Sequence, residues 1–498
     1  MRVTLVGAGP GDPGLLTLTG AARIQNADVV LYDRFVGEEI LAMIPDRAEK
    51  IDVGKNTGSH PVPQDRINRL LLEKAQQGLE VVRLKGGDSF LFGRGGEELE
   101  LLAENGIPFE VVPGVTSAIA GAAYAGIPVT HRDYASSLHI ITGHAKNNER
   151  PRIDYEALVR LQGTLVFMMG VAAIGEICSG CMAAGLAADM PASLVENATT
   201  HAQRKFLGTV GTLSELARAN AVASPALIII GEVCRLSERY DWFGKKPLLG
   251  RQIIVAHAQP GASKLSERLK ELGCQVLEPL SAKITPLTAS DAPLEKALTR
   301  IADYAWLVFT SGVGVRVFFD YLHEAEFDLR MLHGLRIACV GVETEKEIKK
   351  RGIYADYRPA EYNGAALARG LTALVKGGER LLIARAQDAA EDLTRILANA
   401  GIAFDDVAIY EKSYGVEPIS YSNVDFAAFT SASTVEAFMK AAPAGDFGNM
   451  KAVCIGEKTA AAARSHGMDV YVSAEATIEA MVQKIEELAC SLHSADQG

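Results

Sequence analysis

Short apolar runs alternate with longer amphipathic stretches along both halves of the chain. From Gln64 to Gln77 the apolar residues recur at helical spacing, which predicts a helix with one buried face. In the first half the short apolar runs predict strands at Val3–Gly7, Asp28–Tyr32, Leu79–Leu84, Phe109–Val112, His139–Thr142, Thr164–Met168, Ser193–Glu196, Lys205–Val210 and Ala226–Gly231. Strands and helices in alternation are typical of α/β proteins, so we expect this fold class.

The pattern also predicts two modules joined near residue 245. The segment Asp241–Gly250 is rich in Gly, Pro and Lys, and a new apolar run, Arg251–His257, follows it at once. A chain that restarts in this way is typical of a domain fusion. We therefore expect domains at residues 1–245 and 250–498.

An internal repeat marks the second module. Val308–Val315 (VFTSGVGV) is similar to Ala428–Val435 (AFTSASTV), and each is followed by a second strand and a glycine turn, at Cys339–Thr344 and Cys454–Thr459. Each unit predicts a strand, a Thr-Ser turn, a helix, a strand, a glycine turn and a helix. Two related α/β lobes follow from this repeat.

Composition narrows the possible functions. The 498 residues are 48% hydrophobic and 22% charged, as in a globular protein of two to four domains. No apolar run reaches the roughly 18–20 residues of a membrane span, and Met1 leads directly into a strand, so we expect a cytoplasmic protein with no membrane segment. The net charge of −11 argues against nucleic-acid binding, but a local basic pocket can still hold a small polyanion.

The seven cysteines are scattered and odd in number, which suits a reducing compartment. Cys178 and Cys181 form a single CxxC pair within an apolar helical stretch, Val171–Leu186, and no second pair of ligands accompanies them. Core packing is therefore the better interpretation, and we predict no metal site.

Two glycine-dense loops follow predicted strands. Leu84–Glu98 (LKGGDSFLFGRGGEE) brings bare backbone close to a ligand and carries Asp88 and Arg94, which suggests a binding site. Gly7–Gly14 (GAGPGDPG) contains a formal GxGxxG dinucleotide fingerprint. Its two prolines remove N–H donors and interrupt the required entry into a helix, which argues against a nicotinamide or flavin site.

Nine motifs of the first module agree, in order, with one family: Gly7–Gly14, Tyr32–Arg34, Val53–Lys55, Arg83–Asp88, Phe92–Glu98, Val112–Ser117, Gly126–Arg132, Thr142–His144 and Met169–Gly170. Together they closely resemble uroporphyrinogen-III C-methyltransferase, a tetrapyrrole methylase. The resemblance implies two α/β lobes, S-adenosylmethionine as methyl donor, and a homodimer formed through this half. It also implies the transfer of two methyl groups to uroporphyrinogen III, giving precorrin-2.

The same resemblance implies site residues. Asp33 would be the proton acceptor and Lys55 the proton donor; the alternatives are a helix-capping acid and a solvated surface lysine. Cofactor contacts would come from Pro10, Gly86, Gly87, Asp88, Leu91, Thr116, Ser117, Met169 and Ala198. Ser117 and Ala198 depart from the usual Ala and Gly, and Thr116 and Ser117 have the alternative of a helix N-cap.

The substrate carries eight carboxylates, which basic side chains would bind. The candidates near the motifs are Arg34, Lys85, Arg94, His131, Arg132 and Lys146. Of these we select Arg94 and Arg132 as substrate-binding residues.

The second module resembles uroporphyrinogen-III synthase. The matching motifs are Phe309–Val315, Val340–Thr344, Val407–Tyr410 as a short strand ending in tyrosine, Phe429–Val435 and Ile455–Ala460. This family implies two flavodoxin-like lobes joined by two strands, here residues 250–282 with 415–489, and residues 283–414. It cyclises hydroxymethylbilane with inversion of ring D.

In this half Tyr410 matches the tyrosine expected to help the substrate hydroxyl depart. Hydroxyls that could bind substrate carboxylates at helix N-termini are those of Thr310, Ser311, Thr344, Ser431, Ser433 and Thr459, with helix capping as the alternative. Ala256-His257 stands where the family usually has Thr-Arg, so one basic contact is changed or lost.

The sequence thus predicts a bifunctional enzyme that makes uroporphyrinogen III and then precorrin-2. One alternative is a methylase fused to a tetrapyrrole-binding module without catalysis, and another is a nicotinamide-dependent oxidoreductase. The downstream pathway, sirohaem or cobalamin, stays open.

Overall fold

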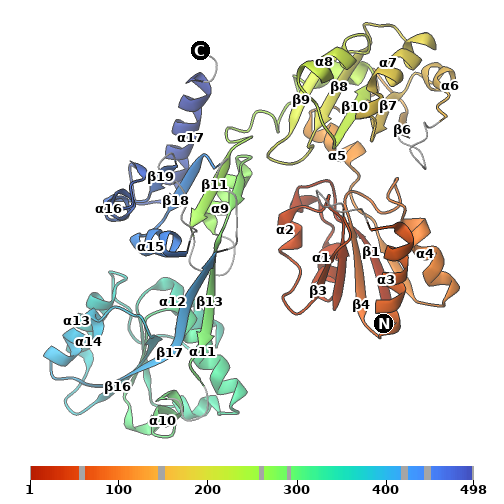
Figure 1. Cartoon of the computed structure of the whole chain (residues 1–498). Helices are drawn as coiled ribbons and strands as arrows, with labels where there is room; N and C mark the ends of the chain where they lie inside the picture. Colours follow the sequence, from red (N-terminus) through yellow and green to blue (C-terminus); the bar gives the residue numbers. More distant parts are fainter. Residues whose placement is uncertain are drawn as a thin grey trace. The chain divides into compact units, whose positions relative to one another are not determined.

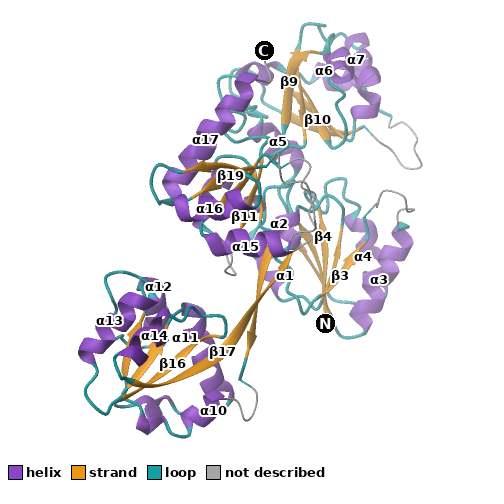
Figure 2. Cartoon of the chain, turned by 60° about the vertical axis from the view of Figure 1, so that its left-hand side comes forward, coloured by secondary structure: helices purple, strands orange, loops and turns teal. Residues whose placement is uncertain are grey.

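A computed structural model describes residues 2–54, 62–143, 152–256, 263–288, 293–416, 424–441 and 450–495 (Figure 1). The chain divides into two compact units, Met1–Ile253 with Leu265–Val276 and Ile485–Gly498, and Ile254–Lys264 with Leu277–Lys484. The described strands form four five-stranded sheets, and helices surround the strands of each (Figure 2). The α/β class is therefore confirmed, while the domain boundaries stay a prediction.

The first sheet is parallel throughout and contains, in spatial order, β3 (Glu49–Asp52), β2 (Val29–Tyr32), β4 (Glu80–Lys85), β1 (Arg2–Gly7) and β5 (Phe109–Val112). Consecutive strand residues face opposite sides, so Leu5 packs in one core cluster and Val6 in another. Helices α3 (Gln64–Gln76) and α4 (Gly95–Glu104) contribute to the first cluster, and α1 (Leu18–Gln25) and α2 (Glu38–Leu41) to the second. Helices on both faces bury all residues of β1 and β4 except the first of each, Arg2 and Glu80.

The second sheet is mixed and runs in the order β6 (Leu138–Thr142), β7 (Thr164–Met168), β10 (Ala226–Ile230), β8 (Pro191–Glu196) and β9 (Arg204–Thr209). One face is covered by α7 (Ile174–Ala183) and α8 (Leu213–Ala219), with α6 (Tyr155–Arg160) beside α7. The other face packs against α5 (Ser117–Tyr124), although α5 follows β5 of the first sheet (Figure 1). The two sheets of this unit are thus tied together by one helix.

The third sheet runs in the order β12 (Gln275–Leu277), β11 (Gln252–Ala256), β18 (Phe426–Phe429), β19 (Lys451–Cys454) and β20 (Asp469–Val472). Numbered along the chain this order is 2-1-3-4-5, the flavodoxin-like order. The helices of this part are α9 (Lys264–Glu271), α15 (Ala432–Ala441), α16 (Glu457–Ser465) and α17 (Ile478–Ala495). The flavodoxin-like prediction is confirmed for this lobe.

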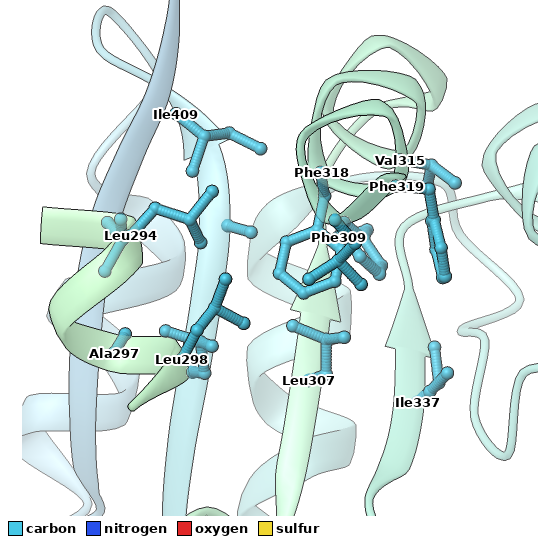
Figure 3. Packing of buried hydrophobic residues seen from close by; sticks show 14 of the residues in the cluster. Leu294, Ala297, Leu298, Leu307, Phe309, Val315, Phe318, Phe319, Ile337 and Ile409 are labelled. Atoms are coloured by element: carbon cyan, nitrogen blue, oxygen red, sulfur yellow. The ribbon is translucent and has the colours of Figure 1, made fainter. Parts of the chain in front are cut away.

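The fourth sheet runs in the order β13 (Leu280–Pro286), β17 (Ala403–Val416), β16 (Arg380–Ala386), β14 (Trp306–Phe309) and β15 (Arg336–Cys339). Only β13 is antiparallel to its neighbour. The helices are α10 (Pro293–Leu298), α11 (Gly312–Glu324), α12 (Val342–Lys350), α13 (Gly364–Leu374) and α14 (Asp392–Asn399). Phe309 of β14 packs at the centre of the core with Phe318 and Phe319 of α11 (Figure 3).

The prediction of a short strand ending at Tyr410 is wrong. Strand β17 continues to Val416, and its second part pairs antiparallel with β13 instead of with β16. The pairing with β16 ends at Tyr410 after a register shift between Arg385 and Ala386. Tyr410 is therefore the residue at which β17 stops pairing with β16 and pairs with β13 instead.

The CxxC pair is part of the core, as predicted. Cys178 and Cys181 lie on α7 in a cluster with Phe167 and Leu194, and burial raises the pKa of both thiols to about 11. Cys490 on α17 is exposed. Because the thiolate is the reactive form, we expect iodoacetamide at pH 8 to alkylate Cys490 first and Cys178 and Cys181 only on unfolding. Peptide mass mapping before and after urea treatment checks this order, and early labelling of Cys178 or Cys181 would contradict it.

No helix within the described residues has both the length and the apolar character needed to cross a membrane.

Candidate active sites

Three loops of the first sheet meet so closely that only glycine fits. They follow the carboxyl ends of β1, β4 and β5, which is the edge where ligands bind in α/β sheets. A Cβ added to Gly7 would lie 2.5 Å from the amide nitrogen of Gly114, and one added to Gly114 would lie 2.2 Å from the carbonyl oxygen of Gly87. Gly87 also pairs with Gly9 through backbone hydrogen bonds of 2.7 and 3.1 Å. The glycines therefore hold the loops together as one surface.

Asp88 clamps two of these loops. Its Oδ1 accepts from the amides of Phe90 and Leu91 at 2.9 and 3.0 Å, and its Oδ2 accepts from Gly114 at 3.0 Å. Gly87, with φ of +69°, presents bare backbone, since a Cβ there would meet no atom within 4 Å. The arrangement leaves an open strip of backbone whose shape Asp88 maintains.

The candidate cofactor residues come from five loops. Pro10 lies after β1, Gly86–Leu91 after β4, and Thr116 and Ser117 after β5, whereas Met169 and Ala198 follow β7 and β8 of the second sheet. Thr116 caps α5 by accepting from Ala118 at 3.3 Å, so the capping interpretation holds for it. After the N-terminal glycine loop, α1 begins only at Leu18, which agrees with the rejection of a dinucleotide fingerprint.

Asp33 is held by a buried arginine. Its Oδ1 lies 2.6 Å from Nη2 of Arg83, whose side chain is 2% exposed, whereas that of Asp33 is 27% exposed. The helix that follows begins at Glu38 after Gly37, so the helix-capping alternative for Asp33 is wrong. Lys55, the second predicted catalytic residue, lies outside the described residues.

The charges behind Asp33 form a buried network. Glu98 of α4 accepts from Nε of Arg83 at 3.0 Å and from Nζ of Lys85 at 2.8 Å, and its side chain is 0% exposed. Burial first, and the nearby positive charge of Arg83 second, lower the pKa of Lys85. The interpretation of Lys85 as a substrate-binding residue is wrong, because its ammonium is buried and bonded to Glu98.

The two selected substrate arginines are accessible. Arg94, in the left-handed conformation before α4, pairs with Glu97 at 3.0 and 2.5 Å and is about half exposed. Arg132 is exposed in the turn between His131 and Ala135. Of the other basic candidates, Arg34 lies over the ring of Phe35, His131 lies near Asp133, and Lys146 is outside the described residues.

In the fourth sheet two predicted residues meet. The hydroxyl of Tyr410 lies 2.8 Å from Oγ of Ser311, and Ser311 caps α11 by accepting from the amide of Gly314 at 2.9 Å. Tyr410 is 1% exposed. The buried Tyr410 and the half-buried Ser311 thus form a hydroxyl pair at the N-terminus of a helix, where the helix dipole favours negative charge.

The remaining hydroxyls follow other strand ends. Thr310 lies after β14 and Thr344 in the first turn of α12 after β15; Ser431 and Ser433 lie after β18, and Thr459 in the first turn of α16 after β19. Ser431 caps its helix by accepting from Thr434, so capping holds for Ser311 and Ser431. Thr344 and Thr459 are both 4% exposed. The changed position Ala256-His257 is described only as far as Ala256.

The buried network of Arg83, Lys85 and Glu98 was not expected from the sequence. Arg83 and Lys85 alternate with apolar residues in β4, a pattern that normally indicates a solvated strand face. The signal that could have revealed them is their place in a strand near the centre of a parallel sheet, where both faces are covered.

Comparison with known proteins gives two family matches. Residues 2–214 match the family model of tetrapyrrole (corrin/porphyrin) methylases, and residues 263–483 match that of uroporphyrinogen-III synthase HemD. The chain is 45% identical over 493 residues to the porphyrin biosynthesis protein HemD of Ruminiclostridium josui, covering 98% of each.

Other relatives match one half only. A siroheme synthase of Chromobacterium violaceum is 52% identical over 241 residues, which is 48% of this chain and 51% of that protein. The crystal structure of uroporphyrin-III C-methyltransferase from Thermus thermophilus in complex with S-adenosylhomocysteine has 42% identity and a TM-score of 0.42, covering 47% of this chain and all of that one.

Proposed function

The chain belongs to the family of the porphyrin biosynthesis protein HemD, with a tetrapyrrole methylase and a uroporphyrinogen-III synthase in one polypeptide, and we propose that it catalyses two successive reactions. It is a bifunctional enzyme of tetrapyrrole biosynthesis. The synthase half cyclises hydroxymethylbilane with inversion of ring D, giving uroporphyrinogen III. The methylase half then methylates that product twice, giving precorrin-2. The observation that carries the proposal is the match of both families, one after the other, along a single chain.

The methylase half uses S-adenosylmethionine, and the loops of the first sheet fit this molecule. The bare backbone at Gly87 admits a ligand at close range, and the capped N-terminus of α5 favours a carboxylate. When bound, S-adenosylmethionine supplies an electrophilic methyl group. We assign its binding to Pro10, Gly86, Gly87, Asp88, Leu91, Thr116, Ser117, Met169 and Ala198.

Asp33 accepts the proton that the macrocycle loses after methylation, and Lys55 donates the proton that its rearrangement requires. Arg83 holds the Asp33 carboxylate through a bond of 2.6 Å, so the acceptor atom is fixed in position. Arg94 and Arg132 bind substrate carboxylates. Arg94 is also paired with Glu97, so it binds a carboxylate only by sharing or exchanging that partner.

In the synthase half Tyr410 protonates the departing hydroxyl of hydroxymethylbilane, which leaves as water. Ser311 lies beside it and completes the hydroxyl pair. Since Tyr410 is 1% exposed, the substrate reaches it only after neighbouring side chains move. Thr310, Thr344, Ser431 and Thr459 bind the carboxylates of the folded substrate.

Three further points belong to the proposal. The methylase occupies residues 1–245 and the synthase residues 250–498, the latter with lobes at 250–282 plus 415–489 and at 283–414. The enzyme is a homodimer through its methylase half. It works in the cytoplasm.

One experiment tests both halves. With hydroxymethylbilane alone, the full chain should give the III isomer of uroporphyrinogen, and with S-adenosylmethionine added it should give the absorbance of precorrin-2. Isomer analysis by liquid chromatography and a spectrum under anaerobic conditions are the measurements. The I isomer alone would contradict the synthase, and would favour a binding module without catalysis. Binding of a nicotinamide cofactor instead of S-adenosylmethionine would contradict the methylase.

A further inference from the structure

A closed ring of four hydrogen bonds joins three segments of the methylase half. The hydroxyl of Tyr124 donates to Oδ2 of Asp12 at 2.7 Å, and the amide of Asp12 donates to Oγ1 of Thr199 at 3.3 Å. The amide of Thr199 donates to Oε1 of Gln203 at 2.8 Å, and Nε2 of Gln203 donates to the carbonyl of Tyr124 at 3.1 Å. The ring thus connects the loop after β1, the end of α5 and the loop between β8 and β9.

Each of these segments carries residues assigned to the cofactor. Pro10 lies two residues before Asp12, and Ala198 directly precedes Thr199. Thr116 and Ser117 begin α5, the helix that ends at Tyr124. The relative position of the segments therefore sets the distances between the cofactor contacts.

The backbone of the ring is strained and closely packed. Thr199 has φ of +71°, a left-handed conformation that a β-branched residue rarely adopts, so its surroundings must hold it there. A Cβ on Gly11 would lie 2.8 Å from Cγ2 of Thr200, which places the two loops in direct contact. Asp12 fixes its own turn as well, because its Oδ1 accepts from Gly14 at 2.7 Å.

Aromatic side chains from the end of the methylase half cover Tyr124. The ring of Trp242 packs edge-on at 4.9 Å between centroids, and that of Phe243 lies at 4.8 Å. Nε1 of Trp242 donates to the carbonyl of Ala123 at 3.0 Å. These residues begin the Gly-, Pro- and Lys-rich segment Asp241–Gly250 that leads towards the synthase.

We propose that Tyr124 is a positioning residue of the methylase, which sets the spacing of the three cofactor-bearing segments through this ring while Trp242 and Phe243 hold it in place. The inference rests on the proposed function, since it takes S-adenosylmethionine as the ligand of these segments. Tyr124 takes no part in the chemistry. Its loss should therefore weaken cofactor binding more than it slows turnover.

The test is Tyr124→Phe in the full chain, which keeps the ring packing and removes the hydroxyl. We expect the Kd of S-adenosylmethionine, measured by titration calorimetry, to rise about tenfold, the size of one lost hydrogen bond to a charged group. The KM for S-adenosylmethionine should rise with it, and kcat should change much less. Tyr155→Phe, which removes a hydroxyl from α6 of the same half, is the matched control and should leave the Kd unchanged.

Thr199→Val removes the hydroxyl that accepts from the amide of Asp12, and it provides a second test of the same ring. It should also raise the Kd of S-adenosylmethionine. The rise in Kd for the double variant Tyr124→Phe/Thr199→Val should be smaller than the product of the two single rises, because both substitutions break the same ring. Calorimetric stoichiometry counts only folded sites, so partial misfolding does not mimic a change in Kd. Multiplicative effects, or an unchanged Kd in Tyr124→Phe, would overturn the inference.

The environment of Trp242 offers an independent readout. The chain has two tryptophans, so Trp306→Phe leaves Trp242 alone. Its fluorescence should change on titration with S-adenosylmethionine, and in Tyr124→Phe/Trp306→Phe the midpoint of this change should move to about tenfold higher concentration; an unchanged midpoint would count against the ring. If the natural chain itself fails to bind S-adenosylmethionine, the proposed function fails instead, and the two failures are thereby distinguished.

Discussion

Replacing Asp33 by Asn should lower the rate of methyl transfer about 10²–10⁴-fold, the range expected when a positioned general base is removed. The amide oxygen of Asn can still accept the bond that Arg83 makes at 2.6 Å, so the loop after β2 keeps its shape. What the variant loses is the ability to take up a proton. Anaerobic assays with uroporphyrinogen III and S-adenosylmethionine, followed by the absorbance of precorrin-2, measure the effect.

The fused enzyme supplies an internal control for this variant. Formation of uroporphyrinogen III from hydroxymethylbilane should be unchanged in Asp33→Asn, because Tyr410 and Ser311 lie in the segment that matches the synthase family, residues 263–483. The Kd of S-adenosylmethionine should also stay the same. A variant that keeps more than about one tenth of the methylation rate would show that Asp33 is not the proton acceptor.

The sequence indicated which loops of the methylase half are dense in glycine, because a run of glycines is recognised within one short segment. Runs of glycine are visible in the sequence, and in the structure Gly7 and Gly114 lie where a Cβ would meet the backbone of another loop. The flavodoxin-like lobe was likewise predicted through short motifs at strand ends. In both cases each motif is a short continuous stretch, although the loops and strands that the motifs form come together from distant parts of the chain.

The partners of Tyr410 and Lys85 on other elements were not predicted. Tyr410 was expected at the end of a strand, but at that residue β17 stops pairing with β16 and continues with β13. Such a change of partner does not alter the apolar pattern of the strand itself, so the sequence does not reveal it. Lys85 was expected to face a substrate, but Glu98, which neutralises it, lies on α4 beyond the glycine loop. Which elements pair with one another is decided by the packing of the whole sheet, and a single segment of the sequence does not show it.

That packing makes Glu98 the side chain whose loss should destabilise the methylase half most. Two cations, Arg83 and Lys85, share its Oε1, and all three side chains are at most 5% exposed. Among the residues that the structure describes, Glu98→Ala would leave the two buried cations with the partly exposed Asp33 as their paired counter-charge. Breaking a buried ion pair from one side costs about 3–5 kcal/mol, because the remaining charge stays desolvated.

Urea unfolding followed through Trp242 in a Trp306→Phe background should show this loss as a midpoint lowered by about 1–2 M, taking an m value near 3 kcal/mol per M. Glu97→Ala is the matched control, one position earlier on α4. It breaks the half-exposed pair with Arg94, and we expect it to cost at most about 1 kcal/mol.

The double variant Lys85→Met/Glu98→Gln distinguishes a coupled network from independent contacts. It removes one charge of each sign from the buried site, so its loss of stability should be smaller than the sum of the two single losses. Methionine also keeps most of the volume of the lysine side chain, which limits the effect of a cavity. Additive losses would show that Lys85 and Glu98 do not depend on each other. Arg83 would still be held in place towards Asp33 by its own bond to Glu98 at 3.0 Å and by the backbone carbonyls of Leu31 and Leu84, to which its Nη1 donates at 3.5 and 3.2 Å.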